Sequence, residues 1–228
     1  LANGGFRVEP FIIQRIEGLQ GEALFEAKPP TVCRDCEFPS AAPPARGEEL
    51  SMEEIIAGKG ERATDLPPAP RVMDERVNFI IDSILKDVIT KGTGQRALAL
   101  ERSDIAGKTG TTNGPMDVWF SGYNRDVVTT AWVGFDKYTP LGRKEFGGTA
   151  ALPIWIEYMR AALQDIPQVE RPMPPGIVII KIDPQTGQLA NAGQRNAIFE
   201  YFKKENVPRR FGYGDSQSGD PGTNTRIN

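Results

Sequence analysis

The sequence has 228 residues, 39% of them hydrophobic, and a formal net charge of −3, so a core is feasible and a nucleic-acid partner is not expected. It contains no histidine, which excludes a Ser-His-Asp triad and a His-ligated metal site within these residues and leaves acid–base chemistry to Lys, Asp, Glu or Tyr. No apolar stretch approaches the roughly 18 residues that cross a bilayer, and the first residues lack the basic and apolar pattern of a signal peptide.

The first third of the chain combines a short hairpin with a long irregular segment. Residues 11–16 and 23–27 are β-like runs separated by glycines, which predicts a hairpin. Residues 28–72 contain many prolines and charges and little periodic apolar content, which indicates an inserted loop. Ser51 and Glu54 have the spacing of a capping box and predict one short helix within this insert.

Cys33 and Cys36 form a C-x-x-C pattern inside the insert. Two cysteines without histidine cannot supply the four ligands of a structural zinc site, so we predict no metal site from this chain alone. A proline-rich loop also lacks the helix start that activates a redox dithiol. In an exported protein the favoured interpretation is a disulfide between Cys33 and Cys36. A metal shared with another chain is the alternative.

Residues 74–91 predict the clearest helix, because their apolar residues follow helical spacing. Asp74 is the candidate N-cap, and Gly92 supplies the stop. The stripe that we expect to be buried consists of Ile80, Ile81, Ile84 and Leu85. Ser83 and Lys86 are then expected on the polar side of the helix.

The next 70 residues predict three strands and a second helix. The strands cover 105–112, 118–123 and 127–135, with a turn at 124–126 between the last two. The helix covers roughly 150–163. Its apolar side consists of Leu152, Trp155, Ile156, Met159 and Leu163. The strand aromatics that we expect in the core are Trp119, Phe120, Trp132 and Phe135.

After residue 167 the composition changes again. Residues 177–182 predict one strand, and the Asp-Pro-Gln-Thr-Gly sequence that follows predicts a tight turn. From about residue 211 the chain is almost free of apolar residues, so we expect this tail to be disordered.

Residues 107–112 read Gly-Lys-Thr-Gly-Thr-Thr, and this run is the strongest functional signal in the chain. Lys-Thr-Gly is a signature of serine acyltransferases that react with penicillin. The Lys108 ammonium can bias a neighbouring lysine toward its neutral form. Thr109 and Thr111 share one face of a strand, where their hydroxyls can bind a carboxylate, and Gly110 lets a peptide lie against the strand edge. Taken alone, however, the tripeptide most often marks only a strand edge and a turn.

Three further segments follow this motif, at 117–123, 132–136 and 147–155. In that order and at those spacings the set resembles the transpeptidase domain of class A penicillin-binding proteins. The resemblance runs from residue 1 to about residue 165 and is interrupted by the insert. Residues 113–116 depart from the family, which usually carries a more acidic linker there.

The resemblance implies an α+β fold in which an antiparallel β-sheet is flanked by helices, as in β-lactamases, and which is incomplete in this chain. It implies that residues 1–166 are the C-terminal half of the transpeptidase domain and that 167–228 are a C-terminal extension. The nucleophilic serine of the family is expected upstream of Leu1, so this fragment alone is expected to be inactive.

The resemblance also assigns roles to the signature strand. Lys108 and Thr111 would be catalytic, with the main-chain N–H of Thr111 forming half of the oxyanion hole and that of the serine forming the other half. The residues that would bind substrate are Lys108, Thr109, Gly110 and Thr111.

The residue types at 83–86 also match the other family signature, Ser-x-x-Lys. Ser83 and Lys86 do lie three residues apart on one helix face. The apolar stripe nevertheless places them on the polar side, the motif lies too close to Lys108, and no Ser-x-Asn element occurs in the sequence. We therefore interpret Ser83 as part of a solvated helix face and not as the nucleophile.

By resemblance, the parent protein is a peptidoglycan D,D-transpeptidase that also carries a glycosyltransferase domain. It would be anchored in the cytoplasmic membrane and face the periplasm. Its partners would be stem peptides, the lipid-linked precursor, β-lactams and the upstream half of its own domain, and its catalysis would need no cofactor. Regulatory lipoproteins and division or elongation proteins are further candidates. The alternatives are a D,D-carboxypeptidase or β-lactamase on the same fold, or a non-catalytic carboxylate-binding fragment.

Overall fold

The computed structural model describes residues 1–32 and 68–208. The contacts divide the chain into two compact units, Leu1–Pro172 and Met173–Asn228. The proposed assignment of residues 1–166 to a half-domain, with an extension after it, stays a prediction.

Several features expected from the sequence lie outside the described residues. They are the pairing of Cys33 with Cys36, the short helix that begins near Ser51, and the disorder of the tail after about residue 211. Among the residues that are described, no helix is long and apolar enough to cross a membrane.

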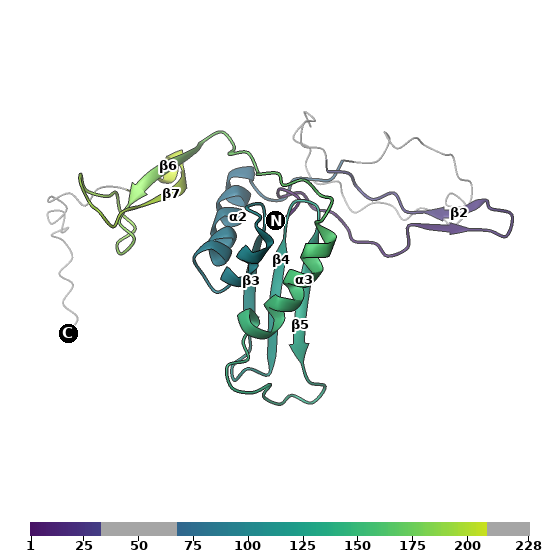
Figure 1. Cartoon of the computed structure of the whole chain (residues 1–228). Coiled ribbons are helices and arrows are strands. Elements are labelled where there is room, and N and C mark those ends of the chain that lie inside the picture. Colours follow the sequence, from purple (N-terminus) through teal and green to yellow (C-terminus); the bar gives the residue numbers. More distant parts are fainter. Residues whose placement is uncertain (33–67, 209–228) are drawn as a thin grey trace, which may run out of the picture. The chain divides into compact units, whose positions relative to one another are not determined.

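A three-stranded antiparallel sheet forms the centre of the first unit (Figure 1). Its strands are β3 (Ala106–Thr111), β4 (Asp117–Tyr123) and β5 (Val128–Gly134), in the order β3-β4-β5. The side-chain oxygen of Asn124 accepts two main-chain N–H bonds and fixes the turn between β4 and β5. All three predicted strands are confirmed, as is the α+β class.

Helix α3 (Leu152–Ala162) continues from the π-helical turn η3 (Gly147–Ala151) and lies in front of β4 and β5 in Figure 1. Its predicted apolar side is buried against the sheet, as expected. Trp155 and Phe120 are both fully buried, and their ring centroids lie 4.9 Å apart. This contact centres a core that holds α3 on one face of the sheet, and truncating such a residue to alanine typically costs about 3–5 kcal/mol.

Helix α2 (Glu75–Thr90) packs beside β3 and is followed by the short 3₁₀ helix η2 (Gln95–Leu100). Asp74 is its N-cap, as predicted. The Asp74 carboxylate accepts hydrogen bonds from the main-chain N–H groups of Arg76 and Val77 at 2.9 and 3.2 Å. These bonds satisfy two of the donors that every helix leaves open at its start.

The predicted buried face of α2 is wrong for Ile84, whereas Ile80, Ile81 and Leu85 are half-buried. The buried residues of the helix are Asn78, Asp82 and Ile89, whereas Ile84 from the predicted stripe is 57% exposed. Lys86 is only partly solvated, since its side chain is 23% exposed and its ammonium pairs with two carboxylates. The polar face turns inward because the surface that it meets carries a phenol and a guanidinium, which pair with Asp82.

The prediction for the strand aromatics is also wrong for three of the four. Phe120 is buried, but Trp119, Trp132 and Phe135 are 42%, 46% and 56% exposed. Side chains alternate between the two faces of a strand, and α3 covers only the face to which Phe120 belongs. Trp119 and Trp132 are paired residues on the other face, where their ring centroids lie 5.9 Å apart.

The predicted hairpin near the start of the chain is present but shorter than expected. Its strands are β1 (Arg15–Glu17) and β2 (Ala23–Glu26), which pair antiparallel. All seven residues of the two strands are exposed, so the hairpin adds nothing to the core of the described part of the unit.

The described part of the second unit is a small antiparallel sheet of β6 (Ile177–Ile182) and β7 (Ile198–Lys203), followed by the 3₁₀ helix η4 (Lys204–Asn206). Strand β6 and its following turn were predicted. Gly187 occupies that turn with a φ of 70°, a left-handed conformation that glycine adopts without a steric cost. Strand β7 was not predicted, because Ile198–Lys203 mixes apolar and charged residues without clear alternation.

Candidate functional site

The signature residues lie on β3, which is an edge strand of the sheet among the described residues. The main-chain N–H of Thr112 donates to the Asp117 carbonyl at 3.0 Å, toward β4. Because these groups alternate in direction along an antiparallel strand, the N–H and C=O groups of Thr109 and Thr111 point away from β4. The N–H of Thr111 is therefore directed toward the open edge, where an extended peptide can be bound.

The Lys108 ammonium lies at the same edge. Its Nζ donates to the Thr109 carbonyl oxygen at 2.9 Å and approaches Thr109 Oγ1 at 3.4 Å. The residue is exposed, and within residues 1–32 and 68–208 no carboxylate forms an ion pair with it. The positive charge is thus available to an anionic ligand. We call Lys108, Thr109, Gly110 and Thr111 the Lys108 edge.

Two residues outside the motif contact its hydroxyl groups. The Thr109 hydroxyl lies 2.8 Å from the Thr93 hydroxyl, in the turn after α2. Thr111 Oγ accepts a hydrogen bond from the main-chain N–H of Gly147 at 3.2 Å. Neither Thr93 nor Gly147 was assigned a role from sequence. The glycine lies in the 147–155 segment that carries the family resemblance, but a main-chain donor has no sequence signal of its own.

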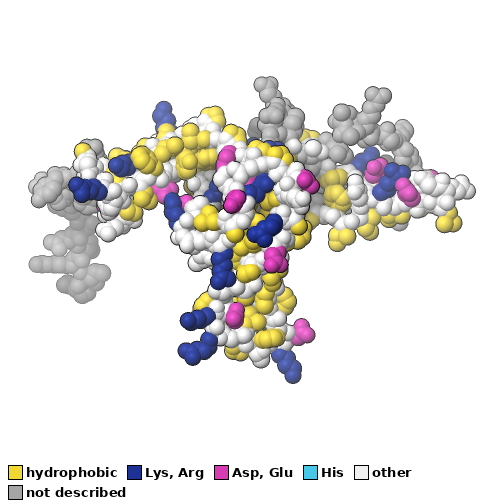
Figure 2. Space-filling model, viewed as in Figure 1, with side chains coloured by type: hydrophobic (Ala, Val, Ile, Leu, Met, Phe, Trp, Pro, Cys, Tyr) yellow, Lys and Arg dark blue, Asp and Glu magenta, His cyan; other side chains and the backbone are white. Residues whose placement is uncertain are grey.

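An apolar rim lies near the Lys108 edge, at the end of the sheet that carries residues 112–116 and 135–146. The two loops are joined by a hydrogen bond from Leu141 N to the Pro115 carbonyl at 2.9 Å. Hydrophobic side chains are visible among the Lys and Arg side chains at this end of the sheet (Figure 2). The exposed aromatic residues of the second loop are Phe135, Tyr138 and Phe146. This rim can contact an apolar part of a bound ligand.

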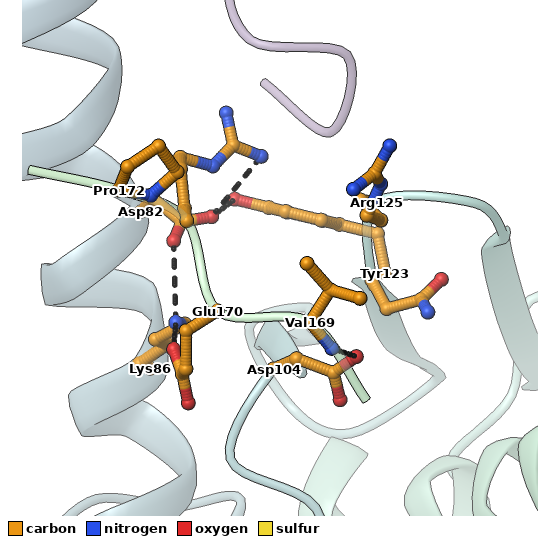
Figure 3. A pocket seen from close by; sticks show the side chains of 10 residues that line it. Asp82, Lys86, Asp104, Tyr123, Arg125, Val169, Glu170 and Pro172 are labelled. Atoms are coloured by element: carbon orange, nitrogen blue, oxygen red, sulfur yellow. Dashed lines mark hydrogen bonds and ion pairs between the residues drawn. The ribbon is translucent and has the colours of Figure 1, made fainter. Parts of the chain in front are cut away.

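A second group of polar residues lies between α2, β4 and the segment at residues 169–172. Asp82 is nearly buried; its carboxylate accepts a hydrogen bond from the Tyr123 hydroxyl at 3.1 Å. It also lies 3.7 Å from both Lys86 Nζ and Arg171 Nη2. Lys86 in turn pairs with Glu170 at 2.8 Å. Figure 3 shows Asp82 between Lys86 and Tyr123. We call these five residues the Asp82 cluster.

Electrostatic interactions in the Asp82 cluster stabilise the protonated phenol of Tyr123 and the ionised carboxylate of Glu170. Burial raises the pKa of Tyr123, and the negative charge of Asp82 raises it further, so the phenol stays protonated. Burial opposes ionisation of Glu170, but hydrogen bonds from Lys86 and Ser103 outweigh it and lower the pKa of the carboxyl group. The cluster lines a cavity of about 60 Å³. Each charge in the cluster is compensated, which favours a structural role for this network.

The Asp82 cluster also includes the lysine of the Ser-x-x-Lys sequence at residues 83–86. The Lys86 ammonium is held by Asp82 and Glu170, as Figure 3 shows. The ammonium is thus engaged by two carboxylates, and among the described residues no hydrogen bond joins it to the Ser83 hydroxyl. This geometry supports the interpretation of Ser83 as a non-catalytic residue.

Comparison with known proteins gives a match over residues 1–140 to a family model described as the penicillin binding protein transpeptidase domain. The chain is 48% identical over 219 residues to penicillin-binding protein 1A of Pseudomonas aeruginosa, a match that covers 91% of this chain and 27% of the relative. It is 36% identical over 251 residues to penicillin-binding protein 1A of Escherichia coli, covering 91% of this chain and 29% of the relative.

A solved structure agrees with these relatives. The crystal structure of penicillin-binding protein 1A from Haemophilus influenzae superposes with a TM-score of 0.73 at 36% identity, and the match covers 92% of this chain and 31% of that one. The chain therefore spans less than a third of the length of these relatives.

Proposed function

Because the chain belongs to the penicillin-binding protein transpeptidase family, we propose that it is part of a peptidoglycan D,D-transpeptidase. In the proposed reaction a serine hydroxyl attacks the D-Ala–D-Ala amide of a stem peptide. D-Alanine leaves, and the acyl group passes from the serine to an amine of a second stem peptide. β-Lactams would acylate the same serine. The reaction needs no cofactor, because the electrons for each new bond come from the attacking oxygen or nitrogen.

The observation that carries this proposal is the geometry of the Lys108 edge. The Thr111 N–H points to the open edge of β3, where it can serve as half of an oxyanion hole. The Lys108 ammonium lies at the same edge, exposed and available to the terminal carboxylate of the substrate. The hydroxyls of Thr109 and Thr111 complete the carboxylate site. The nucleophilic serine would be supplied by a segment upstream of Leu1.

The exposed apolar residues of the first unit support a partner within the same domain. Trp119 and Trp132 lie on the face of the sheet opposite α3, and Ile84 is exposed on α2. We propose that the upstream half of the transpeptidase domain covers these surfaces and brings the serine to the Lys108 edge. The parent protein would carry a glycosyltransferase domain, use the lipid-linked precursor, and act at the periplasmic face of the cytoplasmic membrane. Regulatory lipoproteins and division or elongation proteins remain candidate partners.

Intact mass and peptide mapping of the full-length protein after reaction with benzylpenicillin would test the proposal. We expect a single adduct on a serine upstream of Leu1. Lys108→Ala should slow its formation about a hundredfold, because an electrostatic contact made in the transition state is lost. Lys137→Ala, which removes another exposed lysine in the 135–146 loop, should leave the rate unchanged.

Three results would contradict the proposal. An adduct on Ser83 would make residues 83–86 the nucleophilic motif. Absence of an adduct from the wild-type protein would leave a carboxylate-binding relative without acyl chemistry. If the acyl-enzyme forms but passes its acyl group only to water when a stem-peptide amine is present, the hydrolase alternative is correct.

A further inference from the structure

The segment Gly147–Gly148–Thr149 lies against the Lys108 edge on the face that α3 covers, and we call it the glycine brace. A Cβ added to Gly147 would lie 2.3 Å from the Trp119 carbonyl oxygen and 2.7 Å from that of Gly110. Real Cβ atoms do not approach carbonyl oxygens this closely. The absence of a side chain therefore lets the main chain at position 147 rest directly on the backbone of the signature strand.

Gly148 makes a second close approach, toward the turn that follows α2. A Cβ at this position would lie 2.7 Å from the Thr93 carbonyl oxygen and 3.8 Å from Thr109 Cγ2. Thr93 also contacts Thr109 through its hydroxyl. The brace therefore lies close to Thr93 and Thr109, the two residues whose hydroxyls contact each other.

The main-chain N–H of Gly147 makes the polar contact of the brace, to Thr111 Oγ at 3.2 Å. A threonine hydroxyl has one proton to donate and lone pairs that accept. Because the Gly147 N–H occupies one of the two acceptor lone pairs, the hydroxyl proton is directed away from Gly147 and is left for another acceptor. The contact therefore biases the Thr111 hydroxyl toward donating elsewhere, such as to a carboxylate bound at the edge.

Thr149 holds the main chain that presents this N–H. Its hydroxyl accepts a hydrogen bond from Phe146 N at 2.8 Å, and the O–H donates to the Lys144 carbonyl at 2.9 Å, with the Phe146 carbonyl as a second acceptor at 3.1 Å. Lys144 has a φ of 68°, a left-handed conformation that costs a residue with a side chain about 1–2 kcal/mol. The Thr149 side chain thus stabilises an unfavourable turn immediately before Gly147.

We propose that the glycine brace is a positioning element for the acyl-transfer reaction and acts through Thr111. Thr149 sets the turn, the turn directs the Gly147 N–H at Thr111 Oγ, and that bond keeps the Thr111 hydroxyl as a donor to the substrate carboxylate. This inference rests on the proposed function and adds to it the group that orients one of its carboxylate ligands. The brace itself does not contact the substrate.

Thr149→Val in the full-length protein tests the proposal without adding atoms that could disrupt the fold. The second-order acylation rate is measured with benzylpenicillin and with its methyl ester, which masks the carboxylate. We expect about a tenfold loss for the acid, since hydrogen bonds to charged groups are worth about that factor or more. The loss for the ester should stay below about twofold. Because both rates come from the same preparation, partial unfolding cancels in their ratio.

Two further variants sharpen the test. Thr111→Val removes the hydroxyl through which the brace acts, so adding Thr149→Val to it should produce almost no further loss for the acid. Thr139→Val is the matched control, because its hydroxyl also donates to a carbonyl of the 135–146 loop, that of Lys137, but does not contact the brace. It should leave both rates unchanged.

The outcomes separate this proposal from the proposed function. Equal losses for acid and ester, or independent losses from Thr111→Val and Thr149→Val, would overturn the positioning role and leave the brace as ordinary packing. An unchanged acid rate in Thr149→Val would also overturn it. A wild-type protein that forms no adduct would overturn the proposed function, and this inference with it.

Discussion

The Lys108 edge and the Asp82 cluster both hold a lysine beside hydrogen-bonding groups, but they treat its charge differently. The Lys108 ammonium is exposed and contacts only oxygens of Thr109 among the described residues. The Lys86 ammonium is largely buried and lies between Asp82 and Glu170. The first charge can be used by a ligand, whereas the second is already compensated within the protein.

Perturbed and networked groups therefore do not by themselves locate a reactive site. Tyr123 has a raised pKa and borders the cavity of the Asp82 cluster, as a catalytic group often does. Its partners nevertheless satisfy it, and among the described residues no serine, threonine or cysteine lines the cavity. The Lys108 edge lies on an open strand edge, where main-chain groups and a charge are left for a ligand.

The greatest loss of stability is expected from a substitution in the Asp82 cluster, and not from one at the Lys108 edge. Asp82→Ala removes the carboxylate that faces Lys86, Tyr123 and Arg171, and breaking a buried ion pair typically costs about 3–5 kcal/mol. We expect about 3 kcal/mol, since Lys86 keeps Glu170. Hydrogen exchange of the α2 amides in the full-length protein measures the loss.

The matched control for this substitution is Asp87→Ala, on the same helix. Asp87 is 39% exposed and pairs with Lys91, so its removal should change the stability of α2 by less than about 0.5 kcal/mol. The acylation rate of folded Asp82→Ala should equal that of the wild type. A loss of rate with intact α2 protection would mean that the cluster takes part in the chemistry.

Asp74 provides an intermediate case, an exposed carboxylate whose hydrogen bonds stabilise its charged form. The side chain of Arg76 and the main-chain N–H groups at the start of α2 lower the pKa of Asp74 from 3.8 to about 2. A depressed folded-state pKa contributes stability above the unfolded-state value, and this is lost as pH falls from about 4 to about 2.

Asp74→Ala should therefore destabilise α2 by about 1 kcal/mol at pH 7, the usual value of an N-cap. The difference between variant and wild type should shrink as the pH is lowered through the window from about 4 to about 2. Thermal unfolding at several pH values measures it, with Asp136→Ala as an exposed control that caps no helix. A difference that does not change with pH would show that the charge is irrelevant to the cap.

The smallest expected effect is on the stability of the Lys108 edge itself. Lys108→Ala should change the free energy of unfolding by less than about 0.5 kcal/mol, as for other exposed side chains away from special features. The same variant should lose acylation activity. Lys108→Ala is thus expected to impair acylation and leave stability intact, whereas Asp82→Ala is expected to reduce stability and leave the acylation rate intact. A large drop in the melting temperature would instead make Lys108 a structural residue and weaken the contrast.

Local patterns in the sequence were sufficient for much of the fold. The alternation in β3, β4 and β5 and the spacing in α3 follow from side-chain periodicity, which needs no knowledge of distant residues. The N-cap at Asp74 depends on donors two and three residues away. The Lys-Thr-Gly motif and the segments after it were sufficient to identify the family.

Tertiary structure alone decided which face of α2 is buried and which distant groups come into contact. Helical spacing marked an apolar stripe on α2, yet Asp82 is buried because Arg171, 89 positions away, packs against it. The same holds for the site, where the hydrogen bond from Gly147 to Thr111 spans 36 positions and comes from a main-chain group. The sequence determined the elements and the motif because these depend on neighbours along the chain. The burial of charge and the orientation of the Thr111 hydroxyl depend on partners that only folding brings into contact.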